Sequence, residues 1–197
     1  MSARIIKKRA RFFVAVEGES EQSFVTWLQG LSEKQPHIHL DGFPLGGGGF
    51  KSMLEKAVRL HKRRCRTKGA YRDRFLIVDG DRAEQGDWTI EKLRRAAAKH
   101  KITVCVQSPN HEGLLLRMIP GMEREIPDAA SGEKKLKSRW PGYEKPMNAH
   151  ALGRQFSLED LLRVATVDFD IATLLKRIGL MAGQASPRAH SVADVNG

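Results

Sequence analysis

The sequence predicts a three-layer α/β fold, in which a mainly parallel, four-stranded sheet carries helices on both faces. Short apolar runs bounded by glycine and charge recur along the chain, which is typical of buried parallel strands. The amphipathic segments between them are long enough for the crossovers that parallel pairing requires. Right-handed crossovers would place helices on both faces. A chain of 197 residues can build one such core. We therefore expect a single domain over residues 1–180.

The first half of the chain is predicted to form a strand, a helix, a second strand and a second helix, over residues 11–17, 21–33, 37–41 and 51–67. Ser20 can cap the first helix, whose apolar residues recur at helical spacing from Phe24 to Leu31. The second strand is predicted by the alternation of histidine with Ile38 and Leu40. The second helix follows a run of four glycines and ends in a strongly basic segment.

The second half of the chain is predicted to form strands over 74–79 and 102–107 and helices over 88–100, 111–119, 158–165 and 168–179. Both strands are apolar runs, and the helices carry apolar residues at helical spacing. Between residues 120 and 155 the pattern weakens, and Pro, Gly and Lys become frequent. We interpret this segment as a long insertion without regular structure. Residues 181–197, rich in Gly, Ala and Ser, are expected to form a flexible tail.

The chain is strongly basic, with a formal net charge of +11 and a pI near 10.0. Such an excess favours polyanionic partners, and nucleic acid is the partner we expect. There is no apolar run of the length that a membrane span needs, and no secretory signal is evident at the start. Cys65 and Cys105 show neither metal-ligand spacing nor a disulfide framework. These features favour a cytoplasmic location.

Acidic side chains follow two of the predicted strands directly. Glu17 and Glu21 come after the first strand, and Asp79 and Asp81 come after the third. The carboxyl edge of an open α/β sheet is where such folds place their sites, so the two groups can converge. Carboxylate oxygens suit Mg²⁺ or Mn²⁺. The alternatives are structural: Glu21 would also stabilise a helix N-terminus, and Asp-Gly-Asp is a good turn sequence.

Four short motifs resemble those of the TOPRIM domain, which occurs in topoisomerases, bacterial primases and some nucleases. Residues 16–21 (Val-Glu-Gly-Glu-Ser-Glu) resemble its Glu-Gly start, and residues 78–81 (Val-Asp-Gly-Asp) resemble its Asp-x-Asp. Residues 108–116 and the segment Tyr143-Glu144-Lys145 resemble two later motifs of the RloB-like group, which is related to the OLD-family nucleases. The aromatic residues that flank the glutamate in that group are replaced here. The likeness spans residues 11–180, in the same order.

This resemblance implies a TOPRIM-like, Rossmann-like sheet and a metal-dependent phosphodiester chemistry. Glu17 would be a metal ligand or general acid/base, and Asp79 and Asp81 would hold Mg²⁺. Glu21 is a further candidate ligand, and Glu112 could complete a second metal position. Lys145 could stabilise charge that develops on phosphate, although a solvated lysine is an equally good interpretation.

Candidate nucleic-acid contacts are basic residues of the second predicted helix: Lys51, Lys62, Arg63, Arg64 and Arg66. Ordinary solvation is the alternative explanation for these charges. The run from Gly46 to Gly49 lacks the spacing of a phosphate loop, so a strand–helix connection is favoured. His111, next to Glu112 at a predicted strand edge, is a weaker site candidate.

Taken together, these features predict a metal-dependent nuclease acting on DNA or RNA, in prokaryotic defence against phage or foreign DNA. The alternative is a non-catalytic module that binds nucleic acid or a partner in a defence complex. A nucleotidyl transferase of primase type is disfavoured because no template-handling module is evident. The need for a partner sensor or ATPase subunit, and assembly into a homo-oligomer, are left open.

Overall fold

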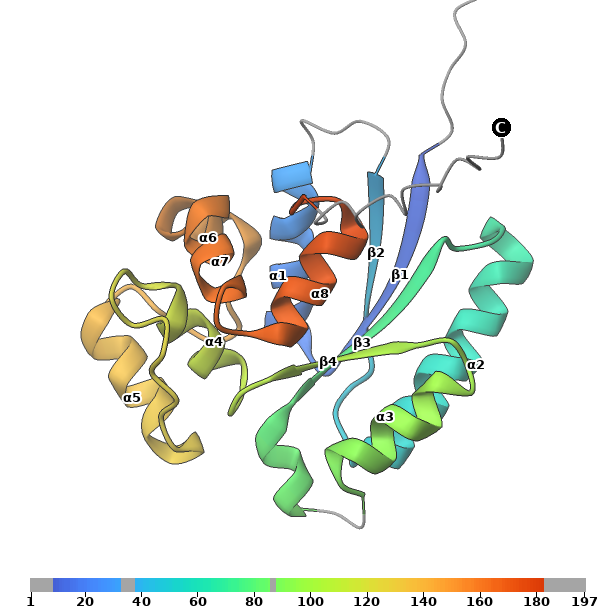
Figure 1. Cartoon of the computed structure of the whole chain (residues 1–197), viewed down its shortest axis with the longest axis horizontal. Coiled ribbons are helices and arrows are strands. Elements are labelled where there is room, and N and C mark those ends of the chain that lie inside the picture. The colour runs from blue at the N-terminus through green and yellow to red at the C-terminus, as the bar shows by residue number, and fades with distance from the viewer. Residues whose placement is uncertain (1–8, 33–37, 86–87, 183–197) are drawn as a thin grey trace, which may run out of the picture.

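A computed structural model describes residues 9–32, 38–85 and 88–182 of the chain (Figure 1). Within them, four strands form one sheet in which every neighbouring pair is parallel. The strands are β1 (Ala10–Val16), β2 (Ile38–Pro44), β3 (Asp73–Asp79) and β4 (Thr103–Gln107), in the spatial order β2-β1-β3-β4. The predicted parallel sheet is confirmed. Of the second predicted strand, His37 lies outside the described residues.

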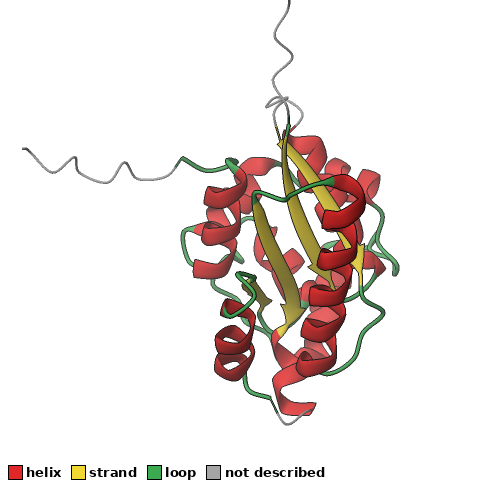
Figure 2. Cartoon of the chain, turned by 90° about the vertical axis from the view of Figure 1, so that its right-hand side faces the viewer, coloured by secondary structure: helices red, strands yellow, loops and turns green. Residues whose placement is uncertain are grey.

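Helices cover both faces of the sheet, which confirms the three-layer prediction (Figures 1 and 2). One face carries α2 (Phe50–Lys68) and α3 (Ile90–Ala98). The other carries α1 (Glu19–Leu31), α4 (His111–Met118), α5 (Ala129–Arg139), α6 (Ala149–Gln155), α7 (Leu158–Ala165) and α8 (Phe169–Ile178). A short 3₁₀ helix, η2 (Gly80–Gln85), follows β3. None of these described helices is long and apolar enough to cross a membrane.

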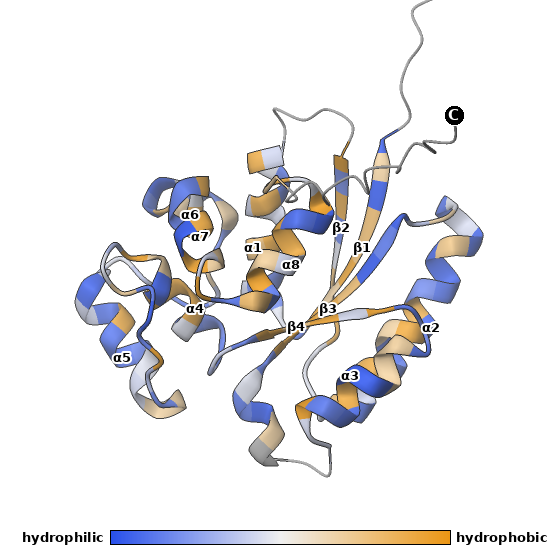
Figure 3. Cartoon of the chain, in the orientation of Figure 1, coloured by the Kyte–Doolittle hydropathy of each residue, from blue (hydrophilic) through white to orange (hydrophobic). Residues whose placement is uncertain are grey.

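The two faces of the sheet build two separate cores, because successive side chains of a strand point to opposite sides. In β1, Phe12 and Val14 pack with α1 and the C-terminal helices, whereas Phe13 and Ala15 pack with α2 and α3. All four side chains are buried. Figure 3 shows the resulting hydrophobic colour along the middle of the strands. Burial on both faces explains why β1 reads as a continuous apolar run rather than an alternating one.

The strand order places a topological switch between β1 and β3. The chain leaves β1 toward β2 on one side, then crosses back over β1 to form β3 on the other. Right-handed crossovers in the two directions put α1 on one face and α2 on the other. The helices therefore diverge at the carboxyl ends of β1 and β3. This is the position at which open α/β sheets bind their ligands.

The segment 120–155 differs from the expected irregular insertion, because it contains α5 and α6. Asp128 and Asn148 cap these helices by accepting hydrogen bonds from backbone N–H groups. Leu136 and Trp140 are buried in the same core as α1 and α4. These two short helices contain few apolar residues, so their hydrophobic periodicity is too weak to predict them from the sequence. The tail predicted over 181–197 lies outside the described residues from position 183 onward.

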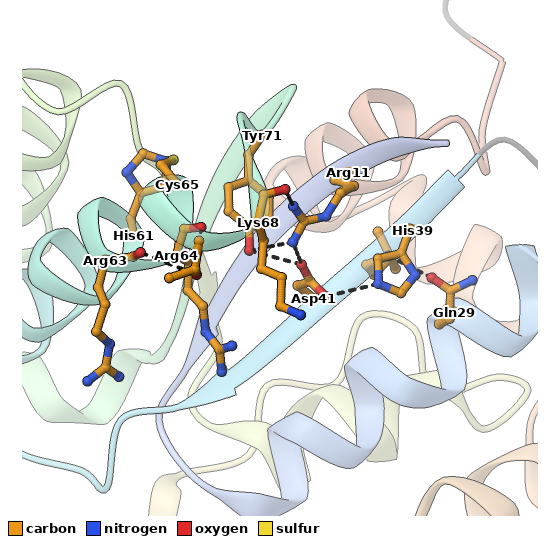
Figure 4. A network of polar contacts seen from close by, with 12 residues as sticks. Arg11, Gln29, His39, Asp41, His61, Arg63, Arg64, Cys65, Lys68 and Tyr71 are labelled. Atoms are coloured by element: carbon orange, nitrogen blue, oxygen red, sulfur yellow. Dashed lines mark hydrogen bonds and ion pairs between the residues drawn. The ribbon is translucent and has the colours of Figure 1, made fainter. Parts of the chain in front are cut away.

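The amino end of the sheet is closed by a polar network that joins β1, β2 and the chain after α2 (Figure 4). Arg11 contacts Asp41 and the carbonyl oxygen of Lys68, and its Nη2 donates to the Tyr71 hydroxyl at 2.9 Å. Tyr71 in turn donates to Asp41 at 2.9 Å. Burial opposes ionisation of Asp41, but hydrogen bonds from Arg11 and Tyr71 outweigh it and lower the pKa of this carboxyl. The network fixes the end of the sheet remote from the switch point.

We predict that Gly113→Ala destabilises the fold where helix α4 begins. An added Cβ at Gly113 would lie 2.5 Å from Pro109 Cδ and 3.0 Å from the Ser108 carbonyl oxygen. Overpacking of this kind costs about 1–3 kcal/mol, or a few degrees of melting temperature for a chain of this size. Gly30→Ala is the control, because a Cβ there meets nothing within 4 Å. Thermal unfolding of both variants checks this, and equal melting temperatures would contradict it.

Candidate active site at the carboxyl edge of the sheet

Acidic side chains from several elements surround one hollow at the switch point. Its volume is about 420 Å³, and we call it the acidic hollow. Glu17 follows β1, Glu21 lies in the first turn of α1, Asp79 ends β3 and Glu112 lies in the first turn of α4. Each of these four side chains lines the hollow. The structure therefore brings together residues that are up to 95 positions apart in the sequence.

Glu17 is buried and is held by an arginine that the sequence interpretation missed. Arg82 of η2 donates from Nε at 2.9 Å and approaches from Nη2 at 2.6 Å, both to Glu17 Oε1. The other oxygen, Oε2, is buried without a partner among the described residues. Burial raises the pKa of Glu17, although Arg82 opposes this effect. The signal that could have found Arg82 is its position directly after the Asp-Gly-Asp turn.

Asp79 is the most strongly perturbed acid of the hollow. Burial is the largest cause, and the neighbouring carboxylates of Glu21, Glu17, Asp81 and Glu112 add to it; together they raise the pKa of Asp79 to about 8. Its Oδ1 is enclosed and has no partner among the described residues. In this environment the neutral acid is favoured unless a cation relieves the crowding of negative charge.

Asp81 lies at the rim, next to the acidic hollow rather than along its wall. It is half-buried in η2, where its backbone N–H donates to the Pro109 carbonyl oxygen at 2.9 Å. Asn110 Nδ2 donates to Asp81 Oδ2 at 3.4 Å. Its charge contributes to the raised pKa of both Glu17 and Asp79. The two aspartates after β3 thus share one electrostatic environment.

Glu21 has the capping role that its position allowed, and it also faces the hollow. Its Oε2 accepts a hydrogen bond from the Gly18 backbone N–H at 2.8 Å, as in a capping box. The side chain is nevertheless buried beside Asp79 and Glu112. The structural and the functional interpretation of Glu21 are therefore compatible in geometry.

Glu112 is paired with residues from the segment that was expected to be irregular. Tyr143 donates its hydroxyl hydrogen to Glu112 Oε1 at 2.6 Å, and Lys145 Nζ lies 2.7 Å from the same oxygen. Burial opposes ionisation of Glu112, but these two partners outweigh it and lower the pKa of the carboxyl. Burial and the adjacent carboxylate raise the pKa of Tyr143 well above its usual value. The Tyr-x-Lys motif is thus brought to Glu112.

Lys145 stands at the mouth of the hollow with 47% of its side chain exposed. Besides Glu112, it contacts Glu133 of α5 at 3.2 Å. These carboxylates raise the pKa of Lys145 against the opposing effect of burial, so the ammonium is charged. A cation at this position faces both the carboxylates and the solvent from which a substrate would arrive.

The donor set of the acidic hollow fits a hard divalent cation. It consists of carboxylates, and two enclosed oxygen atoms, Glu17 Oε2 and Asp79 Oδ1, lack partners among the described residues. In the described part of the chain, however, no three His, Cys, Asp or Glu side chains are already arranged around one metal position. Arg82 and Lys145 hold the oxygens of Glu17 and Glu112 instead.

His111 lies beneath the hollow, in the core, and is not part of its wall. The ring is 1% exposed and packs edge-on against Phe24. Its Nδ1 lies 3.3 Å from Gln107 Oε1. Burial lowers the pKa of His111, which favours a neutral ring. The structure therefore places His111, the first residue of α4, in the packing between α4 and α1.

The glycine run connects β2 to α2 beside Glu17. Gly46, Gly47 and Gly48 have positive φ angles of 71°, 67° and 115°, a conformation that glycine adopts readily. The Gly47 backbone N–H donates to the Glu17 carbonyl oxygen at 3.1 Å, and Lys56 Nζ donates to the Gly47 carbonyl oxygen at 2.9 Å. The run is thus a hydrogen-bonded strand–helix connection that fixes the backbone at Glu17.

The candidate nucleic-acid residues lie along α2. Lys51, Lys62, Arg63 and Arg66 are exposed. Arg64 differs, because it is half-buried and its guanidinium lies 4.7 Å from the centre of the Phe43 ring. Figure 4 shows Arg63 and Arg64 extending from the second half of α2. Lys51 lines a separate hollow of about 410 Å³ that also includes Arg82. The basic helix therefore begins next to the acidic site.

Comparison with known proteins adds no relative. No protein-family model matches the chain, and neither a curated protein nor a solved structure does. The geometry of the acidic hollow and the sequence motifs are therefore what indicates a function for this chain.

We predict that Asp79→Asn stabilises the protein in the presence of a chelator. In the folded protein Asp79 keeps its proton up to about pH 8, whereas the unfolded chain loses it near pH 3.8. Ionisation thus favours the unfolded state increasingly between these pH values and by a constant amount above them. Asparagine cannot ionise, so the variant gains at least about 1 kcal/mol at pH 7.

Thermal melting in EDTA from pH 4 to pH 9 measures this difference. The melting temperatures of wild type and Asp79→Asn should diverge as the pH rises and then run parallel above about pH 8. Asp73→Asn, at the other end of the same strand, is the matched control. A difference that is independent of pH would show that Asp79 is not the titrating group.

We predict that Tyr143→Phe destabilises the fold by about 1.5–3 kcal/mol at pH 7, because a buried carboxylate loses a hydrogen-bond donor. Glu112 has a lowered pKa in the folded state, so this stabilisation is present at neutral pH and is lost as the pH falls through that pKa. Urea unfolding at pH 7 and in acid tests it. The two proteins should approach equal stability in acid, and a constant gap would contradict the assignment.

Proposed function

We propose that this chain is a metal-dependent nuclease that hydrolyses phosphodiester bonds of DNA or RNA. The observation that carries the proposal is the convergence of Glu17, Glu21, Asp79 and Glu112 on one hollow at the switch point. Four buried or half-buried carboxylates in a chain of net charge +11 are costly to the fold, so they are best explained by a function.

In this proposal Glu17 and Asp79 hold Mg²⁺ or Mn²⁺, with Asp81, Glu21 and Glu112 as further ligands. The bound cation would neutralise phosphate charge and lower the pKa of a water ligand. Glu17 has a raised pKa and a free oxygen inside the hollow, so it can accept or return a proton. Lys145 at the mouth can stabilise negative charge that develops on the phosphate.

The motif resemblance supports a setting in the cytoplasm of a prokaryote, in defence against phage or foreign DNA. The same proposal includes a sensor or ATPase subunit as a partner and assembly of the chain into a homo-oligomer. A second candidate function is a non-catalytic module that binds nucleic acid. It is favoured by Arg82 and Lys145, which already neutralise Glu17 and Glu112 and so provide the charge balance that a metal would otherwise supply.

The experiment that separates the two functions is a cleavage assay. A panel of plasmid, oligonucleotides and tRNA is incubated with the protein in Mg²⁺, in Mn²⁺ or in EDTA. We expect cleavage that requires the metal and that falls at least ~100-fold in Glu17→Gln and in Asp79→Asn. Binding without cleavage in every metal would favour the module.

The control for this assay is Asp73→Asn, which makes the same substitution on the same strand at the opposite edge of the sheet. It should cleave at the wild-type rate. Titration with Mg²⁺ distinguishes weaker metal binding from lost chemistry. If Asp79→Asn reaches the wild-type rate at saturating metal, Asp79 is not an essential ligand.

A further inference from the structure

A second charged hollow lies at the opposite end of the sheet, between the second half of α2, the beginning of β3 and the turn from α3 into β4. Its volume is about 230 Å³. Among the described residues no carboxylate lines it, and we call it the basic hollow. Its six basic side chains are His61, Lys62, Arg74, Lys99, His100 and Lys101.

These cations come from three separate elements, so no single local cause explains them. Lys99 and Lys101 follow α3, and cations near a helix C-terminus are favourable. Lys62 belongs to α2 and does not owe its position to that helix end, whereas Arg74 of β3 is hydrogen-bonded to the turn that follows it. Four permanent positive charges without a carboxylate among the described lining residues create a positive potential in the hollow. An anion is therefore the ligand that it would attract.

The turn that presents two of these cations is well defined. Arg74 Nη1 donates to the His100 carbonyl oxygen at 2.9 Å, and the Ile102 backbone N–H donates to the Ala97 carbonyl oxygen at 3.1 Å. Lys101 has a φ of 56°, a left-handed conformation that suits Gly or Asn better than Lys. Backbone preference therefore does not explain the lysine at this position, whereas a charged ligand in the basic hollow would.

The basic hollow is separated from the acidic hollow by the length of the strands. Arg74 and Asp79 lie near opposite ends of β3, roughly 17 Å apart at the rise of a strand. Helix α2 spans the same gap in the opposite direction, with Lys51 at its start beside Arg82 and Lys62 at the basic hollow. Figure 2 faces the side of the sheet that α2 and α3 cover. Helix α2 thus carries an exposed lysine at each end of this gap.

We propose that the basic hollow holds a backbone phosphate of the nucleic acid whose scissile phosphate lies at the acidic hollow. This inference rests on the proposed function. A strand of B-form DNA advances about 3.4 Å per nucleotide, so the two positions are about five nucleotides apart. The protein would therefore bind polynucleotides that reach both hollows and would bind shorter fragments weakly.

The same cations would also attract free phosphate or a short polyphosphate acting as an effector. The two sources of phosphate differ in one measurable respect. If the hollow binds a backbone phosphate, the affinity for nucleic acid depends on its length. If the hollow binds a free anion, that anion binds in the absence of nucleic acid.

The test is binding in EDTA, where no metal-dependent cleavage occurs. Labelled DNA and RNA of about 4 and about 20 nucleotides, single-stranded and as duplexes, are titrated with wild type and with the double variant Lys62→Gln/Lys99→Gln. We compare the two proteins on the long ligand that wild type binds most tightly. The double variant should bind it at least ~10-fold more weakly than wild type at low salt, and the slope of log K against log salt should be smaller by about one. The short ligand should bind weakly to both proteins.

A matched double variant, Arg124→Gln/Lys134→Gln, removes two exposed charges away from α2 and α3, since Arg124 lies between α4 and α5 and Lys134 lies in α5 (Figure 1). It should lose less than ~3-fold in affinity. The charge-conserving Lys62→Arg/Lys99→Arg variant should bind as wild type, which separates loss of charge from misfolding. Equal losses in the two glutamine variants would mean that only net charge matters and would overturn the proposal.

Two further arms complete the design. Calorimetric binding of inorganic phosphate to wild type but not to Lys62→Gln/Lys99→Gln, with unchanged nucleic-acid binding, would make the basic hollow an effector site and overturn the proposal. Length-dependent binding without cleavage in any metal would leave the basic hollow supported and would instead reject the nuclease function.

Discussion

Repulsion between carboxylates at the carboxyl ends of β1 and β3 is the constraint on which the rest of the structure depends. The sheet topology forces Glu17 and Asp79 together, and α1 and α4 add Glu21 and Glu112. Each buried negative charge must be paired, protonated or bound to a cation. The fold uses the first two solutions, since Arg82 pairs with Glu17 and Asp79 has a pKa of about 8. Binding of a cation, the third way to stabilise these charges, is part of the function that we propose.

The partners of Glu112 come from the segment 120–155, whose sequence pattern is the weakest before the C-terminal tail. Tyr143 and Lys145 follow α5 and reach Glu112 from more than thirty residues away in the sequence. Their position is fixed by packing, because Trp140 lies 5.6 Å from the Tyr143 ring and 5.4 Å from Phe156, between ring centres. The loop between α5 and α6, held by this packing, thus supplies one wall of the site through Lys145.

Periodicity predicted the fold well wherever side-chain burial has a strong pattern. The four strands and the helices from α1 to α4 begin and end within three residues of their predicted bounds, because burial on both faces of the sheet leaves long apolar runs. The same rule failed for α5 and α6, where buried side chains such as Leu136 and Leu152 are widely spaced among polar ones. Arg82 was missed for another reason, since its position after the Asp-Gly-Asp turn does not indicate a partner, and Glu17 is 65 residues away in the sequence.

The sequence by itself determined the candidate site residues: the acids after two apolar strands, the later Glu and Tyr-x-Lys motifs, and the basic helix. This was possible because strand ends in a parallel sheet lie at one edge, so order along the chain implies position. Only the tertiary structure decided which charges meet. The pairing of Arg82 with Glu17, the enclosure of Asp79 and the gathering of Lys62, Arg74 and Lys99 involve side chains from different elements. Electrostatic energy depends on distance in space, which spacing in the sequence does not report.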